Sequence, residues 1–438
     1  MLTRRRTLLA TALGACAALV LATPMTTSAT TPSPAEITKA AEAAHEARSV
    51  YLVHKVGTPE LRSAVARTGI DVLGADGDVM SVRASEAEAA ALRAKGFEVE
   101  FRAAGGHGDH GHSHGDVGIA DFPPADAAYH NFAEVTANLR KAEADHGSIA
   151  KLSSIGKSHE GRDLWMIKIS DNVATDENEP EVLFNCNQHA REHLTVEMCL
   201  RIVNRFTDGY TTDPALKSFV DSREIWVIPS VNPDGTEYDV ATGRYRSWRK
   251  NRQGPGTDLN RNWDYNWGCC GGSSGSTSSE TYRGPSAFSA PETSRLRDFV
   301  NSRVVGGKQQ ITANIDFHTY SELVLWPYGY TTADTGPGLT ADDARTFQTL
   351  GRQMAATNNY KPQQSSDLYI TDGSIIDWMW GRHKIWSYTF ELYPSSAAGG
   401  GFYPPDEVIT RETSRNDKAV DLMLSYADCV PRVIGKTC

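Results

Sequence analysis

The chain has 438 residues, of which 40% are hydrophobic and 22% are charged, so it can build a sizeable core and is not a disordered protein. Its formal net charge of −10 at pH 7 argues against nucleic acid as the main partner, because no basic excess is present to displace the counterions of phosphates. The length suits two or three units of about 150 residues, or one large α/β domain with a small companion.

The first 29 residues have the pattern of an export signal. Three arginines, Arg4 to Arg6, precede an apolar stretch from Leu8 to Leu21, and small residues continue to Ala29. The apolar stretch is shorter than the roughly 20 residues that span a bilayer, so a cleaved signal is favoured over a membrane anchor. We therefore expect a secreted protein with no membrane attachment after signal removal, exported by the Sec or the twin-arginine route.

The cysteines that remain after removal of this signal are even in number, which favours disulfide bonds in an exported chain. The two nearest the C-terminus would tie down the tail, and the first two would join a strand to the following helix. The adjacent pair either bond to each other or pair elsewhere. The six are Cys186, Cys199, Cys269, Cys270, Cys429 and Cys438.

Residues 30–102 have the pattern of a small α+β unit. Its predicted strands are short apolar segments or segments in which apolar and charged residues alternate, and one of its predicted helices is rich in alanine. Strands are predicted at 49–53, 79–82 and 97–101, and helices at 60–68 and 84–95. Residues 103–120 are instead rich in Gly, His and Asp, a composition that cannot bury a core. We expect a hydrophilic, protease-sensitive linker there; loose metal binding by its histidines is the alternative.

Residues 121–438 alternate short apolar runs with helical patterns, which predicts an α/β layer architecture. Strands are expected at 164–170, 181–185, 224–229, 310–318 and 387–392, and helices at 129–146, 195–207, 291–303 and 341–358.

Chemically active residues follow three of these predicted strands. His189 and Glu192 follow the strand at 181–185, His318 ends the strand at 310–318, and Glu391 lies near the end of the strand at 387–392. Two imidazoles and one carboxylate with an open fourth position are a common catalytic zinc site. Because ligands of open α/β sheets bind beyond the carboxyl ends of strands, we expect these side chains to meet, with Glu391 as a general base.

Several segments resemble those of the zinc metallocarboxypeptidases of the carboxypeptidase A/B family. They occur in the family order, the match covers roughly residues 121–427, and the likeness is closest to secreted bacterial members such as carboxypeptidase T. The segments are His189-Ala190-Arg191-Glu192, Trp248-Arg249-Lys250-Asn251-Arg252, Asp258-Leu259-Asn260-Arg261-Asn262-Trp263, Glu280-Thr281-Tyr282-Arg283-Gly284, Phe317-His318-Thr319-Tyr320 and Phe390-Glu391-Leu392.

The resemblance implies a three-layer fold, with a mixed central β-sheet flanked by helices and a small α+β prodomain before it. It also implies that His189, Glu192 and His318 hold one Zn²⁺. Asp258 would accept a hydrogen bond from the far nitrogen of His189, as carboxylates beside zinc ligands commonly do. Glu391 would take a proton from the attacking water and pass it to the leaving amine.

The resemblance assigns substrate contacts as well. Arg252 would stabilise the oxyanion, Asn260 and Arg261 would grip the terminal carboxylate of the substrate, and Tyr369 would close over the same end. Binding of the terminal carboxylate would make the enzyme an exopeptidase. Secondary carboxylate contacts are implied for Arg191 and Arg249. The alternative for all these arginines is surface ion pairing, most of all for Arg249.

The pocket for the substrate's last side chain is expected around Ser374 and Ile376. In this family Ile376 stands where basic-residue carboxypeptidases carry a carboxylate, and Ser374 stands where broad-specificity bacterial members can carry an acid. We therefore expect an apolar or aromatic preference, or a broad one.

The expected partners are C-termini of peptides and proteins as substrate and a protease that activates the precursor by cutting between about residues 103 and 121. We expect a monomer. Related bacterial enzymes can carry Ca²⁺, but no specific motif in this sequence indicates a calcium site.

Three other functions compete with this interpretation. His189 to His193 also fits the H-x-x-E-H pattern of inverzincin endopeptidases, which requires the motif to lie inside a helix and Glu192 to be the base. A secreted, zinc-containing binding module without catalysis would lack a base such as Glu391. A cell-wall peptidase of the same broad fold would act on muropeptides instead of ordinary peptides.

Overall fold

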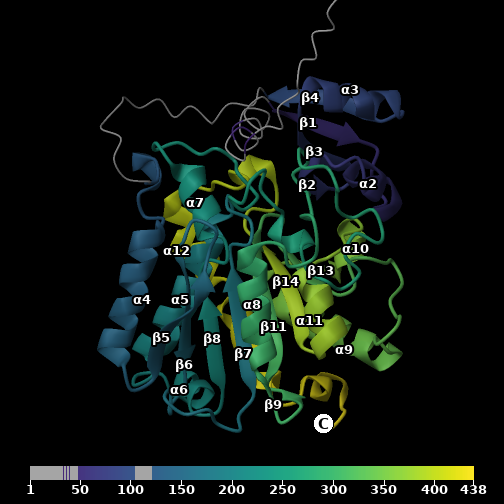
Figure 1. Cartoon of the computed structure of the whole chain (residues 1–438). Helices are drawn as coiled ribbons and strands as arrows, with labels where there is room; N and C mark the ends of the chain where they lie inside the picture. Colours follow the sequence, from purple (N-terminus) through teal and green to yellow (C-terminus); the bar gives the residue numbers. More distant parts are fainter. Residues whose placement is uncertain (1–32, 34–35, 37–38, 40–47, 104–120) are drawn as a thin grey trace, which may run out of the picture.

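The computed structural model describes residues 33, 36, 39, 48–103 and 121–438. The predicted export signal and nearly all of the predicted linker lie outside the described residues. Figure 1 shows a small N-terminal unit lying against one end of a large layered domain. Among the described residues, none of the helices combines the length and the apolar character that a membrane span requires.

The N-terminal unit is a four-stranded antiparallel sheet in the order β2-β3-β1-β4, with two helices. The predicted strands and helices are confirmed, and their buried apolar side chains form a core of their own. One strand, β2, was not predicted, because its Asp, Gly and Asp residues break the apolar alternation. The elements are β1 (Ser49–His54), α2 (Pro59–Ala66), β2 (Asp71–Asp76), β3 (Val79–Ala84), α3 (Glu86–Ala94) and β4 (Glu98–Ala103).

The large domain is built on an eight-stranded sheet. Its central strands β14, β11, β7 and β8 run parallel to one another, while β12 pairs antiparallel with β14, and β6 pairs antiparallel with both β8 and β5, so the sheet is mixed. In sheet order the strands are β13 (Lys361–Gln364), β12 (Leu323–Trp326), β14 (Trp386–Leu392), β11 (Ile311–Thr319), β7 (Glu181–Cys186), β8 (Glu224–Ile228), β6 (Asp163–Ile169) and β5 (Ala150–Lys157).

Helices cover both faces of this sheet, which explains why its central strands are continuous apolar runs. In β7, Val182 and Phe184 pack into the core that contains α4, α5, α9 and α13, while Leu183 packs into the core that contains α8 and α11. The predicted three-layer α/β fold is therefore confirmed. The helices are α4 (Phe132–His146), α5 (His193–Gly209), α6 (Pro214–Val220), α7 (Pro233–Val240), α8 (Pro291–Ser302), α9 (Ala341–Asn358), α10 (Ser365–Leu368), α11 (Ile375–His383), α12 (Ile409–Ser414) and α13 (Asp417–Tyr426).

Each cysteine pair considered in the sequence is bonded: Cys186 to Cys199, Cys269 to Cys270, and Cys429 to Cys438. The first joins β7 to α5, and the last closes the C-terminal tail beyond α13. A two-stranded ribbon of β9 (Val304–Val305) and β10 (Lys308–Gln309) leads from α8 into β11.

Candidate active site

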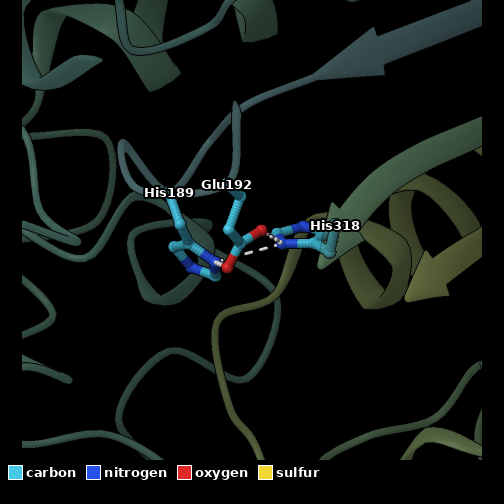
Figure 2. Close-up of side chains that lie close together, drawn as sticks. All are labelled: His189, Glu192 and His318. Carbon is cyan, nitrogen blue, oxygen red and sulfur yellow. Dashed lines mark hydrogen bonds and ion pairs between the residues drawn. The ribbon is translucent and has the colours of Figure 1, made fainter. Parts of the chain in front are cut away.

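Three side chains converge at the carboxyl ends of β7 and β11, as the sequence predicts. His189 and Glu192 lie in the turn between β7 and α5, and His318 lies near the end of β11 (Figure 2). The Nδ1 atom of His189 is 2.8 Å from a Glu192 oxygen and 3.0 Å from Nδ1 of His318, which is 2.9 Å from the other Glu192 oxygen. Ligand atoms this close can surround one ion at the Zn–N and Zn–O distances of about 2.0–2.2 Å. The three residues therefore fit a zinc site.

The far nitrogen of each histidine is bonded to a buried aspartate. Nε2 of His189 is 3.1 Å from Asp258, as predicted, and Nε2 of His318 is 2.7 Å from Asp316. Such carboxylates hold the imidazole with its other nitrogen toward the metal. Asp316 was not predicted, although its position two residues before His318 on one strand puts both side chains on the same face.

Nearby charges shift the pKa values of Asp258 and His318. Burial alone raises the pKa of Asp258, but the adjacent guanidinium groups of Arg249 and Arg261 outweigh it and lower the pKa below its ordinary value. Burial alone lowers the pKa of His318, but Asp316 and Glu192 raise it well above its ordinary value. The carboxylates of Glu192 and Asp316 therefore favour positive charge beside His318, as a bound divalent cation would supply.

Glu391 lies beside the zinc-binding group because of strand register. Strands β11 and β14 are parallel neighbours, and His318 is paired with Glu391 across them. Glu391 lines the same cavity as the three zinc-binding residues. Burial raises its pKa to about 8, and the charge of Glu192 adds to this rise while His318 and Arg249 oppose it.

Arg252, expected at the oxyanion, and Arg249, expected to make a secondary carboxylate contact, are placed differently. Arg249 lines the cavity, and its Nε and Nη2 donate to Asp258 at 3.1 and 3.0 Å. Arg252 does not line the cavity: its guanidinium carbon lies 3.5 Å from the ring centre of Tyr238, and its Nε lies 3.8 Å from Glu160. The expectation for Arg252 was therefore wrong, because a spacing of three residues in an irregular loop turns the side chain away from the cavity.

The pair expected to bind a carboxylate belongs to the same cavity. Asn260 and Arg261, from the short 3-10 helix Leu259–Arg261, both line the cavity. The Asn260 side chain accepts a hydrogen bond from the backbone N–H of Ile375 at 3.0 Å, which leaves its amide nitrogen facing Nε2 of His318 at 3.4 Å. Arg261 is 3% exposed, so its charge is held at a buried surface of the cavity.

Tyr369, Ser374 and Ile376 also line the cavity, as predicted. Ser374 caps the N-terminus of α11, accepting from the N–H of Asp377, and Ile376 lies in the first turn of that helix. The carboxylates among the described lining residues are Glu192 and Glu391, both at the zinc-binding end. A cationic substrate side chain would therefore find no carboxylate beside Ile376.

The N-terminal unit covers this cavity. Val72, Leu73 and Gly74 of β2 line it, and its volume is about 70 Å³, far below the roughly 300–1,000 Å³ of typical ligand pockets. Arg191, expected to contact substrate, is fully buried and donates to both oxygens of Asp71 at 2.6 and 2.8 Å. This contact was not predicted, because the two residues are far apart in sequence.

Other contacts from the N-terminal unit hold the segment around Tyr369. The backbone N–H of Ile370 donates to the Ser63 hydroxyl at 2.9 Å, and Arg62 donates to the carbonyl of Asp367 at 3.1 Å. The Tyr369 ring packs against the core of the N-terminal unit.

The fifth residue of the H-x-x-E-H pattern lies away from the zinc-binding group. His193 is the first residue of α5, and its Nε2 bonds to Asp239 at 2.8 Å. Because His189 and Glu192 precede the helix, the motif does not present His189 and His193 on one helical face. The inverzincin alternative therefore fails on geometry.

Two acidic groups elsewhere were not predicted. One consists of Asp171, Glu177 and Glu179, and the other of Asp176, Glu181 and Glu224. In the second, Lys168 pairs with Glu224 at 2.7 Å, and Arg303 pairs with Glu181 and Asp176. Part of this negative charge is thus already compensated by cations of the chain.

Comparisons with known proteins point to zinc carboxypeptidases. A family model described as zinc carboxypeptidase matches residues 135–419. The chain is 57% identical to a "Zinc carboxypeptidase" of Saccharothrix mutabilis subsp. capreolus over 99% of both chains, and 32% identical to "Zinc carboxypeptidase A 1" of Anopheles gambiae over 67% of both. The crystal structure of carboxypeptidase A from Helicoverpa armigera is 23% identical, covers 87% of this chain and 98% of its own, and superposes with a TM-score of 0.70.

Proposed function

The chain belongs to the zinc carboxypeptidase family, and we propose that it is a secreted enzyme, made as a precursor, that removes single residues from the C-termini of peptides and proteins. The observation that carries the proposal is the meeting of a zinc-binding group, Glu391 and the Asn260–Arg261 pair in one cavity. An arginine that binds a carboxylate in the same cavity as the zinc-binding group would admit only the last peptide bond of a chain.

The residues that line the cavity have different roles in the proposed hydrolysis. His189, Glu192 and His318 would hold one Zn²⁺, which when bound would supply a Lewis acid for the water and for the substrate carbonyl. Glu391 accepts a proton from the attacking water and returns it to the leaving amine. Arg249, in the role first expected for Arg252, donates to the oxygen on which negative charge develops.

The terminal carboxylate of the substrate is bound by Arg261 and Asn260, with Tyr369 closing over it. A planar guanidinium can bind both oxygens of a carboxylate, which fixes the orientation of the last residue. Its side chain then points toward Ile376 and Ser374. An apolar floor without a carboxylate supports a preference for apolar or aromatic C-terminal residues. Steady-state rates on peptides ending in Phe, Leu, Arg and Lys test this, and faster cleavage of Arg than of Phe would contradict it.

We also propose that residues 30–102 are a propeptide that blocks the site until it is cleaved off in the segment 103–120. The small cavity volume, the bidentate pair of Asp71 with Arg191 and the contacts around Tyr369 support this role. Asp71 offers Arg191 the same group that a substrate would, a carboxylate, so the two compete.

The precursor proposal is tested by limited proteolysis followed by N-terminal sequencing and activity measurement. We expect activity to appear with a new N-terminus between residues 103 and 121. A secreted protein that begins near Thr30 and is fully active would contradict it. In the Asp71→Asn variant the N-terminal unit should be held less tightly, so the uncleaved precursor should show more residual activity.

We also propose that the signal at residues 1–29 directs export of the chain and that the enzyme is a monomer. It has no nucleic-acid or membrane partner. A non-catalytic binding module is disfavoured because Glu391 lies in the cavity with the zinc-binding group. A muropeptide substrate is disfavoured because Asn260, Arg261 and Tyr369 suit an ordinary C-terminal residue, and parallel assays on both substrate types decide between them.

A further inference from the structure

A loop behind the cavity holds the guanidinium of Arg261. Nε of Arg261 donates to the carbonyl of Gly272 at 2.9 Å, and Nη1 donates to the carbonyl of Asn260 at 2.8 Å. Both acceptors are neutral carbonyls, so these contacts orient the guanidinium without neutralising it. The position of the Gly272 carbonyl therefore decides where the charge of Arg261 points.

That carbonyl belongs to a loop folded around the carboxylate of Asp372. Asp372 is fully buried, and one of its oxygens accepts from the N–H groups of Cys270 at 3.0 Å and Gly272 at 2.9 Å. Its other oxygen accepts from the hydroxyl of Ser273. Hydrogen bonds to an ionised group are roughly twice as strong as neutral ones, so this one side chain is a strong anchor of the loop.

Two covalent features restrict the same loop. The disulfide between Cys269 and Cys270 closes a ring directly before Gly271, which limits the backbone conformations open to the chain. Gly272 lies so close to the next segment that a Cβ atom would be 2.4 Å from the Cα of Thr371. Only glycine lets the backbone approach Asp372 this closely.

We propose that Asp372 and the Cys269–Cys270 disulfide together position Arg261 for the substrate's terminal carboxylate. They fix the carbonyl of Gly272, which in turn fixes the guanidinium. Asp372 is a positioning residue, because it acts through this carbonyl and not on the substrate. The inference rests on the carboxylate-binding role proposed for Arg261.

The kinetic test uses proteolytically activated enzyme and three variants. Asp372→Ala and the double variant Cys269→Ala/Cys270→Ala should raise KM for free-carboxylate peptides about tenfold, the order expected for a lost charge-assisted contact, with kcat within about twofold and zinc content unchanged. Asp372→Asn should raise KM less, because its amide oxygen can still accept from the loop. The matched control Cys429→Ala/Cys438→Ala removes a disulfide far from the cavity and should leave KM unchanged.

A second readout separates positioning of Arg261 from general damage to the neighbouring side-chain pocket. If Arg261 is mispositioned, KM rises by the same factor for peptides ending in Phe, Leu and Ala, which share only the carboxylate. A rise that depends on the last side chain, or an unchanged KM in both Asp372→Ala and the cysteine variant, overturns the inference.

A crystal structure of the Asp372→Ala variant tests the position of the Arg261 guanidinium without relying on activity. If that variant does not fold, the cysteine variant is used instead. A displaced Arg261 guanidinium supports the inference, and an unmoved one overturns it. If the wild-type enzyme releases no C-terminal residues, the proposed function fails, and the crystal structure still decides whether the loop positions Arg261.

Discussion

Replacing Arg249 and Arg252 separately tests which arginine stabilises the transition state. The two lie three residues apart in one loop, but only Arg249 lines the cavity, while Arg252 stacks on Tyr238. If Arg249 donates to the developing oxyanion, the Arg249→Ala variant of the activated enzyme should lose about 100- to 1,000-fold in kcat, or about 3–4 kcal/mol of transition-state stabilisation.

The Arg252→Ala variant should behave in the opposite way. It loses a guanidinium packed 3.5 Å from the ring centre of Tyr238, so its free energy of unfolding should fall by about 1 kcal/mol. Its kcat/KM should stay within about twofold of the wild-type value, because no part of the cavity lining changes.

Arg249 also donates to Asp258, which orients His189, so loss of the side chain has a second consequence to control. Zinc content and kcat are therefore measured on the same samples, together with Arg249→Lys, which keeps the charge but not the planar fork. The reasoning is refuted if Arg252→Ala loses 100-fold in kcat with zinc retained while Arg249→Ala remains active.

Three further predictions follow from the surroundings of the zinc-binding group. The His193→Gln variant should keep bound zinc and the His318→Gln variant should lose it, which metal analysis of the purified proteins measures. Loss of zinc from His193→Gln but not from His318→Gln would favour the inverzincin alternative. Asp316→Asn should lower zinc affinity by about 10- to 100-fold in chelator competition, because Nε2 of His318 loses its carboxylate partner; an unchanged affinity would contradict this role. Glu391 must be ionised to accept a proton. Burial raises the pKa of Glu391 to about 8, and a bound Zn²⁺ would lower it. We therefore expect kcat/KM to fall as the pH decreases, with the midpoint of the fall below pH 8. A rate that increases on acidification below about pH 6 would exclude Glu391 as the base.

The zinc-binding residues could be predicted because they depend on local patterns. Each follows a short apolar run, and parallel strands of one sheet bring such ends together. Asp316 carries a similar local signal, an aspartate two residues before His318 on one strand, which we overlooked. The strands missed in the large domain, β5, β12 and β13, lie at or near the sheet edges, where polar residues such as those of β13 hide the pattern.

Contacts between distant segments carry no such signal. The pair of Asp71 with Arg191 joins the two units through residues 120 positions apart in the sequence, and nothing around either residue indicates the other. The choice between Arg249 and Arg252 depended on the path of an irregular loop, which residue spacing does not determine. The anchoring of Gly272 by Asp372 likewise arises only when the loop after Trp263 folds back on the segment before α11.

The most direct test of the account measures zinc content and amino-acid release on one activated sample. Two peptides of the same sequence, ending in Phe with either a free carboxylate or an amide, are the substrates. We predict one zinc ion per chain, release of free Phe from the first peptide, loss of that release on chelation, and no cleavage of the second. Equal cleavage of both peptides, or full activity without bound metal, would contradict the account.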